Sequence, residues 1–382
     1  MNESMKTIKT MRQLFCAGLA LLALAACSQD ETTRADRSGA IGFRTMLGKA
    51  TRAVTTKANM GKFNVTAFPT GGTNYFTNLE VASPDNGSTW NTAATYYWPA
   101  GTLNFTAYAP ADELKPLVTI DKDGQKIAAY SPVQKVADQK DIVVAFNAGG
   151  KTTYGATGVP MNFKHALSQI EVKALCTKDN LKVKVMGVKL GAVNSKADFA
   201  FPQTETAAAY VVPRANWSNL STPKDYLAED AAGTGLTLTA AAQSIMFGSD
   251  NFLMIPQQLE AFSKTKLGGA YIGVFCQISS DDGEGNLTQI YPGGGANAYA
   301  FTAVGINTEW LPGKKYIYTL TFGDGGGIVP PNQDNPNPGT PNNPTPPTPP
   351  NPSTPGDPIL DKPIKFTVNV ENWTDQTEGL NM

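Results

Sequence analysis

A proline-rich segment near the C-terminus sets the strongest limit on how this chain folds. The sequence turns glycine-rich at Gly323 and then runs PPNQDNPNPGTPNNPTPPTPPNPSTPGDP to Pro358. Proline lacks the amide donor that helices and sheet ladders need, so this stretch extends neither of them. At about 3.1 Å per residue, roughly 30 such residues reach on the order of 90 Å as a semi-rigid spacer. Residues 324–358 are therefore predicted to be a linker that tethers residues 359–382 to the body.

The residues after the linker have the alternation of a single β-strand. Apolar side chains occupy every second position, at Ile364, Phe366, Val368 and Val370, and the stretch ends at Trp373. This period of two is typical of a strand with one buried face, which needs a sheet to pair with. A slip of one residue would turn the apolar face outward, so these side chains would fix the register. We predict that the strand fills a groove on this molecule or on a neighbouring copy.

Composition narrows the fold class and the partners. The chain has 382 residues, of which 41% are hydrophobic, enough for two globular domains with separate cores. Its 31 basic and 32 acidic residues nearly balance, and because the body has no basic run, we expect no nucleic-acid partner. Hydrophobic runs are short and bounded by Gly, Asn, Asp and Pro, which indicates an all-β protein.

Two series of predicted strands follow one another along the body. They place one β-domain at residues 53–160 and a second at residues 161–323. In the first series, Ala94–Trp98 and Leu103–Tyr108 are expected to form a hairpin, because a proline and a glycine separate them.

The N-terminus has the features of an export signal. Three basic residues precede an apolar run that is too short to cross a bilayer, which predicts a signal peptide at residues 1–26. The run ends in Leu-Ala-Ala-Cys27, the pattern of a bacterial lipobox, so we predict that Cys27 is lipidated. The alternative is ordinary signal cleavage beside an incidental cysteine. The acidic stretch at residues 28–31 resembles a signal for display on the outer face of the outer membrane.

A short alternating strand at Ile41–Leu47 precedes a polar segment that contains Thr51, Arg52 and Ala53. An exposed arginine after a strand is a place where a protease could release that strand. On composition alone, an N-terminal edge strand followed by a basic loop is the alternative, and it is favoured there.

Few residues suit catalysis or metal binding. His165 is the only histidine, and no carboxylate or cysteine stands at ligand spacing from it, so we expect a structural role. The acidic stretch Ser279–Asn286 lacks the Asp-x-Asp-x-Asp spacing of a calcium loop and is expected to be a polar turn. Cys176 and Cys276 are either buried thiols or a disulfide. We expect no enzyme, no metal site and no cofactor.

Several segments, taken in their order along the chain, carry a family resemblance: Tyr96–Pro99, Leu103–Pro110, Phe163–Val172, Ile255–Gln257 and Ile364–Trp373. Together with the lipobox and the arginine segment, they resemble the fimbrillin family, the type V pilins of anaerobic Gram-negative bacteria. The resemblance implies two transthyretin-like β-sandwich domains, lipoprotein export through Cys27, and cleavage between Arg52 and Ala53 by an arginine-specific protease. The cleavage would remove the propeptide, residues 27–52, and let subunits polymerise by strand exchange. The departure is the linker, which is longer and richer in proline than the family's usual connection.

The function expected from this resemblance is that of a structural subunit of a fimbria on the cell outer membrane, supporting adhesion. Ile364, Phe366, Val368, Val370 and Trp373 would form the donor strand. The expected partners are other copies of the chain, other fimbrial subunits, the outer membrane through the lipid, and a host surface or glycans. The alternative is a monomeric surface lipoprotein that binds glycans through exposed aromatic residues. Tyr97 and Trp98 are candidates for such a platform, although packing at the end of a sandwich is the commoner role of such pairs.

Overall fold

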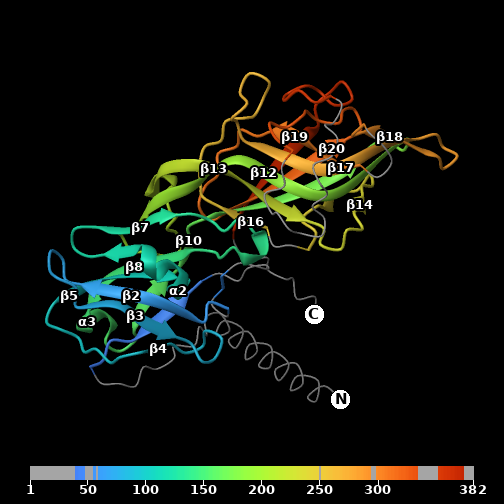
Figure 1. Ribbon diagram of the computed structural model, residues 1–382. Helices are drawn as coiled ribbons and strands as arrows, with labels where there is room; N and C mark the ends of the chain where they lie inside the picture. The colour runs from blue at the N-terminus through green and yellow to red at the C-terminus, as the bar shows by residue number, and fades with distance from the viewer. Residues whose placement is uncertain are drawn as a thin grey trace, which may run out of the picture.

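The computed structural model describes residues 39–47, 55–56, 59–248, 251–293, 298–333 and 352–373. These residues form an elongated, almost entirely β molecule with two lobes, coloured mainly blue to green and yellow to red in Figure 1. Cys27, Arg52 and Ala53 lie outside the described residues, so the predicted lipid attachment and processing sites have no structural account. No helix in the described ranges has the length and hydropathy needed to cross a membrane.

The first lobe is built on a six-stranded sheet in the order β10-β8-β5-β2-β3-β4. Its strands are β2 (Lys62–Phe68), β3 (Phe76–Ala82), β4 (Asn91–Thr92), β5 (Thr102–Ala109), β8 (Val143–Gly150) and β10 (Lys164–His165). A separate parallel pair consists of β1 (Phe43–Met46) and β9 (Val159–Asn162). The short helices of both lobes are α2 (Ala111–Leu114), η1 (Lys115–Leu117), η2 (Val136–Asp138), α3 (Lys151–Tyr154) and η3 (Arg214–Asn216).

The second lobe packs an eight-stranded sheet against a five-stranded one. The larger sheet contains β6 (Val118–Ile120), β7 (Gln125–Tyr130), β12 (Leu181–Ala200), β13 (Trp217–Glu229), β14 (Leu236–Thr237), β17 (Tyr271–Asp281), β18 (Leu287–Tyr291) and β19 (Ala300–Gly305). The smaller contains β11 (Ser168–Cys176), β15 (Gln243–Ser244), β16 (Phe252–Met254), β20 (Lys314–Phe322) and β21 (Lys365–Asn372).

Each lobe has its own hydrophobic core, and a third cluster joins them. Alternate side chains of β20 are buried, as the period of two requires, and they meet inward side chains of β12 and β17. In the first lobe, β2, β5 and β8 bury their apolar face against β1 and β9. The third cluster includes Tyr108 of the first lobe, Phe199 and Trp217 of the second, and Trp373. The predicted all-β class with sandwich domains is therefore observed.

The structure departs from the predicted strands at Ala94–Trp98. The expected strand at Ala94–Trp98 is wrong, because only an isolated bridge at Tyr97 pairs there. Its expected partner, β5, already has both edges occupied by β2 and β8.

The predicted boundary between residues 160 and 161 stays a prediction, and strand pairing crosses it. The β6–β7 hairpin hydrogen-bonds with β12, on the far side of that boundary in the sequence.

The two ends of the proline-rich segment are held together on the second lobe. The amide of Gly356 donates to the Val329 carbonyl at 2.8 Å, and the Val329 amide donates to the Asp357 carbonyl at 2.9 Å. Val329 and Ile359 are both buried in the core of that lobe. We call these contacts the Val329 clasp. The predicted linker is therefore anchored at both ends.

Candidate functional site

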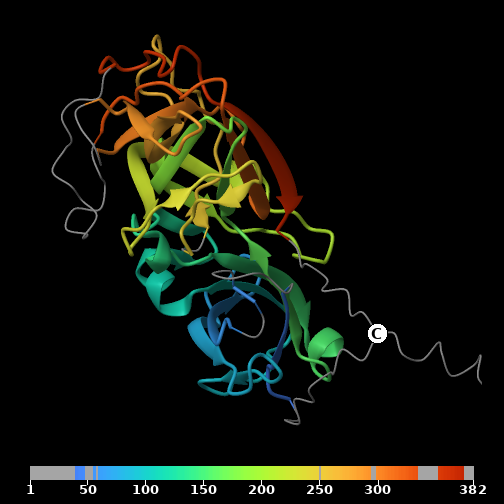
Figure 2. The same ribbon diagram turned by 90° about the vertical axis from the view of Figure 1, so that its right-hand side faces the viewer.

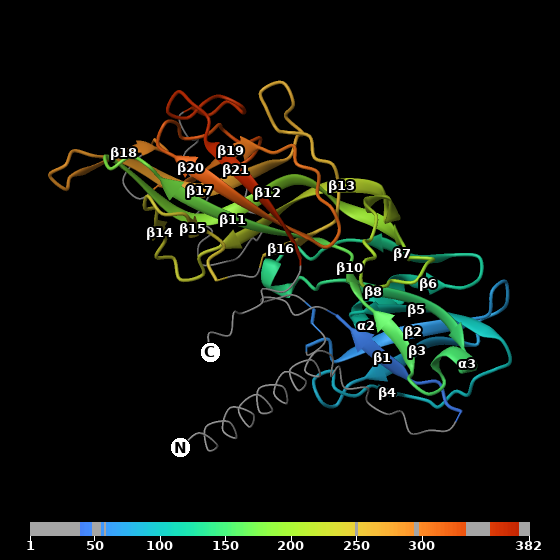
Figure 3. The ribbon, with the colours of Figure 1, turned by 180° about the vertical axis from the view of Figure 1, so that it is seen from behind.

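The first element of the site is β1, which fills a seat in the first lobe. One side of β1 forms a parallel ladder with β9, in which Phe43 pairs with Val159. Two residues before β1 begins, the Ile41 amide donates to the Tyr96 carbonyl at 2.8 Å. The Phe43 side chain is only 7% exposed, and its ring packs edge-on against Phe63 and Phe105 at 6.2 and 5.8 Å. We call this apolar position the β1 seat. Figure 3 shows β1 in front of the sheet that contains β2 and β3.

The second element is β21, the strand expected from the terminal alternation. It pairs antiparallel with β20 of its own chain, so that Phe366 stands opposite Leu320 and Val368 opposite Tyr318. In the described part of this sheet β21 lies at the edge, as the dark red strand in Figure 2 shows. Ile364 is buried and Phe366 and Val368 are half-buried, but Val370 is 50% exposed. The strand is present, and its role as a donor stays a prediction.

Trp373 directly follows this strand and lies buried between the lobes. Its amide donates to the Gly313 carbonyl at 2.9 Å. Its ring stacks on the His165 imidazole, with centroids 4.4 Å apart and planes at 9°. His165 also contacts Asp141: Nδ1 of the imidazole lies 2.7 Å from Asp141 Oδ2. His165 therefore connects the end of β21 to a buried carboxylate.

Sequence reasoning missed Asp141 as the partner of His165, because the two are separated by 24 positions. The pairing of β8 with β10 places His165 opposite Val143, two residues after Asp141, and so brings them together. The available signal was an aspartate directly before the apolar strand at 142–146.

The ends of β1 and β21 line one cavity of about 280 Å³. Leu47 comes directly after β1, and Asn372 and Trp373 close β21. His165 and Tyr210 also line this cavity. The strand that precedes the predicted cleavage segment and the predicted donor strand thus end at the same place in the fold.

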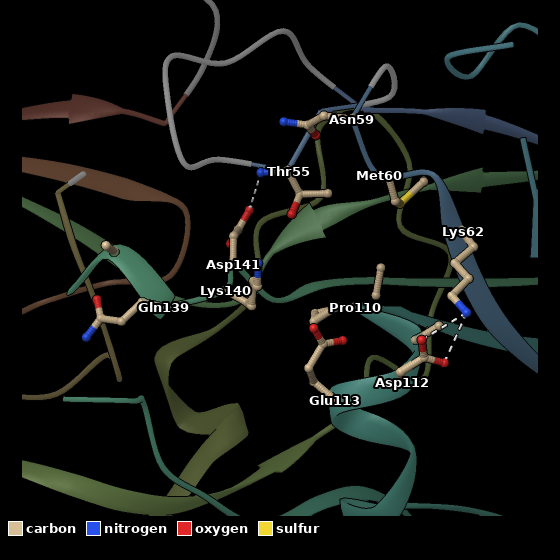
Figure 4. Close-up of a pocket in the computed structure, with 13 residues that line it drawn as sticks. Thr55, Asn59, Met60, Lys62, Pro110, Asp112, Glu113, Gln139, Lys140 and Asp141 are labelled. Carbon is tan, nitrogen blue, oxygen red and sulfur yellow. Dashed lines mark hydrogen bonds and ion pairs between the residues drawn. The ribbon is translucent and has the colours of Figure 1, made fainter. Parts of the chain in front are cut away.

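A second cavity, of about 410 Å³, lies where the chain resumes after that segment (Figure 4). Thr55, Asn59, Lys62, Asp112 and Asp141 are among its lining residues. Lys62 Nζ forms ion pairs with Asp112 at 2.9 Å and with Glu80 at 3.1 Å. Hydrogen bonds to Asp112 first, and to Glu80 second, raise the pKa of Lys62 above its ordinary value. Asp112, an exposed carboxylate of this cavity, therefore has Lys62 as its counter-charge.

The surroundings of the remaining candidate residues indicate structural roles. Over the described ranges, no three His, Cys, Asp or Glu side chains gather as a metal ion would require. Asp282 accepts hydrogen bonds from the amides of Glu284 and Asn286, which makes the acidic stretch a tight polar turn. Cys176 and Cys276 are buried free thiols, and burial raises the pKa of the Cys276 thiol. Tyr97 is 62% exposed, whereas its neighbours Tyr96 and Trp98 pack on the first core.

The sequence profile of the fimbrillin-like family matches residues 51–335, about three quarters of the chain. The chain belongs to the fimbrillin-like family. The family resemblance stated from the sequence is thus confirmed, and it supports a fimbrial, non-enzymatic role at the cell surface. A search of curated proteins finds no significant match.

Solved structures give the fold of this fimbrillin-like protein. A fimbrial protein from Bacteroides vulgatus is 16% identical, with a TM-score of 0.57 over 88% of this chain and 100% of that one. A protein from Bacteroides uniformis, proposed to act in cell adhesion, is 15% identical with a TM-score of 0.42, covering 88% and 99% of the two chains. The first likeness confirms the predicted fold class.

Proposed function

We propose that this fimbrillin-like protein is a structural subunit of a cell-surface fimbria that assembles by strand exchange. In this proposal it is exported as a lipoprotein through Cys27, cut between Arg52 and Ala53, and joined to the next subunit by its terminal strand. The observation that carries the proposal is the β1 seat. It holds a short strand that pairs with β9 along its length, is preceded by a backbone hydrogen bond from Ile41 to Tyr96, and ends shortly before Arg52 in the sequence.

Loss of β1 would make its seat a template for another strand. The amides of Val159 and Phe163, which donate to Gly42 and Met46 at 2.8 and 2.9 Å, would lose their partners. The rings of Phe63 and Phe105 would lose the cover of Phe43. A strand edge with unpaired backbone groups, lying over apolar side chains, is the usual acceptor for an added strand. The alternating side chains of β21 have the pattern that such a seat accepts.

The strand β21 is suited to leave its own sheet. It has a ladder with β20 on one side only, and its outward residues are exposed. Exchange into the β1 seat would give the strand a ladder with β9 and apolar contacts with Phe63 and Phe105. These contacts support transfer between subunits once the seat is vacant.

Replacement of Arg52 by alanine tests the processing step. We expect the variant to remain a lipidated monomer, because β1 stays covalently attached and keeps its seat. The readout is the ladder of high-mass species from cells, with Lys49→Ala in the same polar segment as the matched control. Polymers of normal length from Arg52→Ala would show that cleavage here is not the switch.

Replacement of Cys27 by alanine tests the lipid. Without the Cys27 thiol, acyl transfer has no acceptor, so metabolic labelling with a fatty acid should fall to background and surface display should decrease. Cys16→Ala is the matched control, because Cys16 lies within the signal peptide that export removes. Equal labelling of both variants would contradict the lipobox assignment.

A further inference from the structure

Lys189 of β12 is a buried lysine on the face of the larger sheet that points away from the core. Its neighbours Val188 and Leu190 lie in the core of the second lobe, so Lys189 points the other way, yet its side chain is 0% exposed. Nζ lies 4.0 Å from the centre of the Phe301 ring and 5.8 Å from that of Tyr271. A charged amine is costly to bury, so the retention of this lysine calls for an explanation.

A carboxamide and a carboxylate lie within reach of this amine. Nζ donates a hydrogen bond to Asn332 Oδ1 at 3.1 Å, and Asp225 Oδ2 is 3.7 Å away. Asp225 is held in place, because its Oδ1 accepts from the Ala192 amide at 2.9 Å and its Oδ2 accepts from the Tyr271 hydroxyl at 3.4 Å. An amine, a carboxamide and a carboxylate therefore meet beside two aromatic rings.

The chain around Asn332 is fixed to the same sheet. The side chain of Gln333 accepts from the Phe301 amide at 2.7 Å and donates to the Phe301 carbonyl at 3.1 Å. Four residues before Asn332, Ile328 and Ala303 exchange backbone hydrogen bonds at 2.8 and 2.9 Å. These contacts hold the carboxamide against the buried amine. Such positioning favours reaction between two groups, because neither has to be brought in by diffusion.

We propose that Lys189 and Asn332 become joined by an isopeptide bond that forms within the folded chain. The nucleophile is the uncharged amine. Asp225 takes a proton from the ammonium, and the apolar surroundings favour the resulting uncharged pair. Nζ then attacks Cγ of Asn332, so that one C–N bond forms and the C–N bond to Nδ2 breaks.

The reaction needs no other reactant. Both protons that Nζ loses pass through Asp225 to the departing nitrogen, which leaves as ammonium, and the carboxylate is regenerated. Asn332 is exposed, so the ammonium can depart to solvent, whereas the amine of Lys189 is enclosed. The bond ties the start of the proline-rich linker to β12, and it is independent of the proposed strand exchange.

The test is the intact mass of the full chain, recovered folded and then denatured. We expect each chain to weigh less than its sequence requires by the mass of one ammonia molecule. An asparagine that cyclises to a succinimide also loses ammonia, so a tryptic digest must in addition contain a branched peptide that joins Lys189 to Asn332. A chain without the mass loss overturns the proposal, and so does a mass loss without this branched peptide.

Four variants locate the reaction. Lys189→Met, Asn332→Ala and Asp225→Asn should all keep the full mass of their sequences. Lys196→Met is the matched control: it removes an exposed lysine of the same strand, so the mass loss should persist. Asn332→Ala changes an exposed side chain, so it tests the bond even if a change at the buried lysine prevents folding. The same mass loss in Asn332→Ala overturns the bond, and complete mass loss in Asp225→Asn overturns the proton transfer through Asp225.

Discussion

Replacement of Phe43 by alanine is expected to lower the free energy of unfolding of the uncut protein by about 3–5 kcal/mol, the usual cost of removing a buried phenylalanine. The ring is 7% exposed and contacts Phe63 and Phe105, so its loss leaves a cavity under β1. Chemical denaturation of the first lobe is the measurement. Met46→Ala is the matched control, because Met46 lies in the same strand but is 43% exposed.

The Phe43→Ala substitution is also expected to change assembly. In the Arg52→Ala background, a weakened β1 vacates its seat more often, so Phe43→Ala should restore short polymers that Arg52→Ala alone lacks. Arg52→Ala with Met46→Ala should remain monomeric. If Phe43→Ala destabilises the uncut protein but restores no assembly, the β1 seat is not the acceptor.

Paired aspartates at Phe366 and Val368 are expected to abolish assembly while the subunit remains folded. Both side chains face the core of the second lobe, and on β20 they stand opposite Leu320 and Tyr318. A charge at either position costs several kcal/mol wherever the strand packs on an apolar surface. The measurement is the ladder of high-mass species, together with the molar mass of the purified subunit. The matched control is Thr367→Asp with Asn369→Asp, which adds the same charge on the outward face of the same strand.

Assembly, and not thermal stability, is the decisive readout for this pair. A strand that served only a neighbour would leave the stability of the body unchanged, but β21 also pairs with β20 of its own chain. For the same reason, truncation after Gly356 is a poor test, because it removes Ile359 and Ile364 from the core of the second lobe. Normal polymers from the Phe366→Asp, Val368→Asp variant would contradict strand exchange.

Local patterns in the sequence predicted many of the strands. The features that these patterns missed depend on pairing between distant parts of the chain. The alternation at Ile364–Val370 was sufficient to place β21, since the period of a strand is a local property. The strand expected at Ala94–Trp98 failed because β5 had no free edge, which no local pattern reveals. The contact of His165 with Asp141 and its stacking on Trp373 were hidden because they depend on strand registers. The candidate site was therefore predictable as two strands, but not as the cavities where they end.

If subunits exchange β21 as proposed, the Val329 clasp would give the fimbria two joint lengths. While the clasp holds, an exchanged β21 would be connected to its own lobe by the few residues after Ile359, and the joint between subunits would be short. If tension opens it, roughly 25 further residues at about 3.1 Å each lengthen the joint by on the order of 80 Å. The backbone hydrogen bonds at Val329 would then set the force at which each joint yields, so the filament would extend under load before any subunit is pulled out.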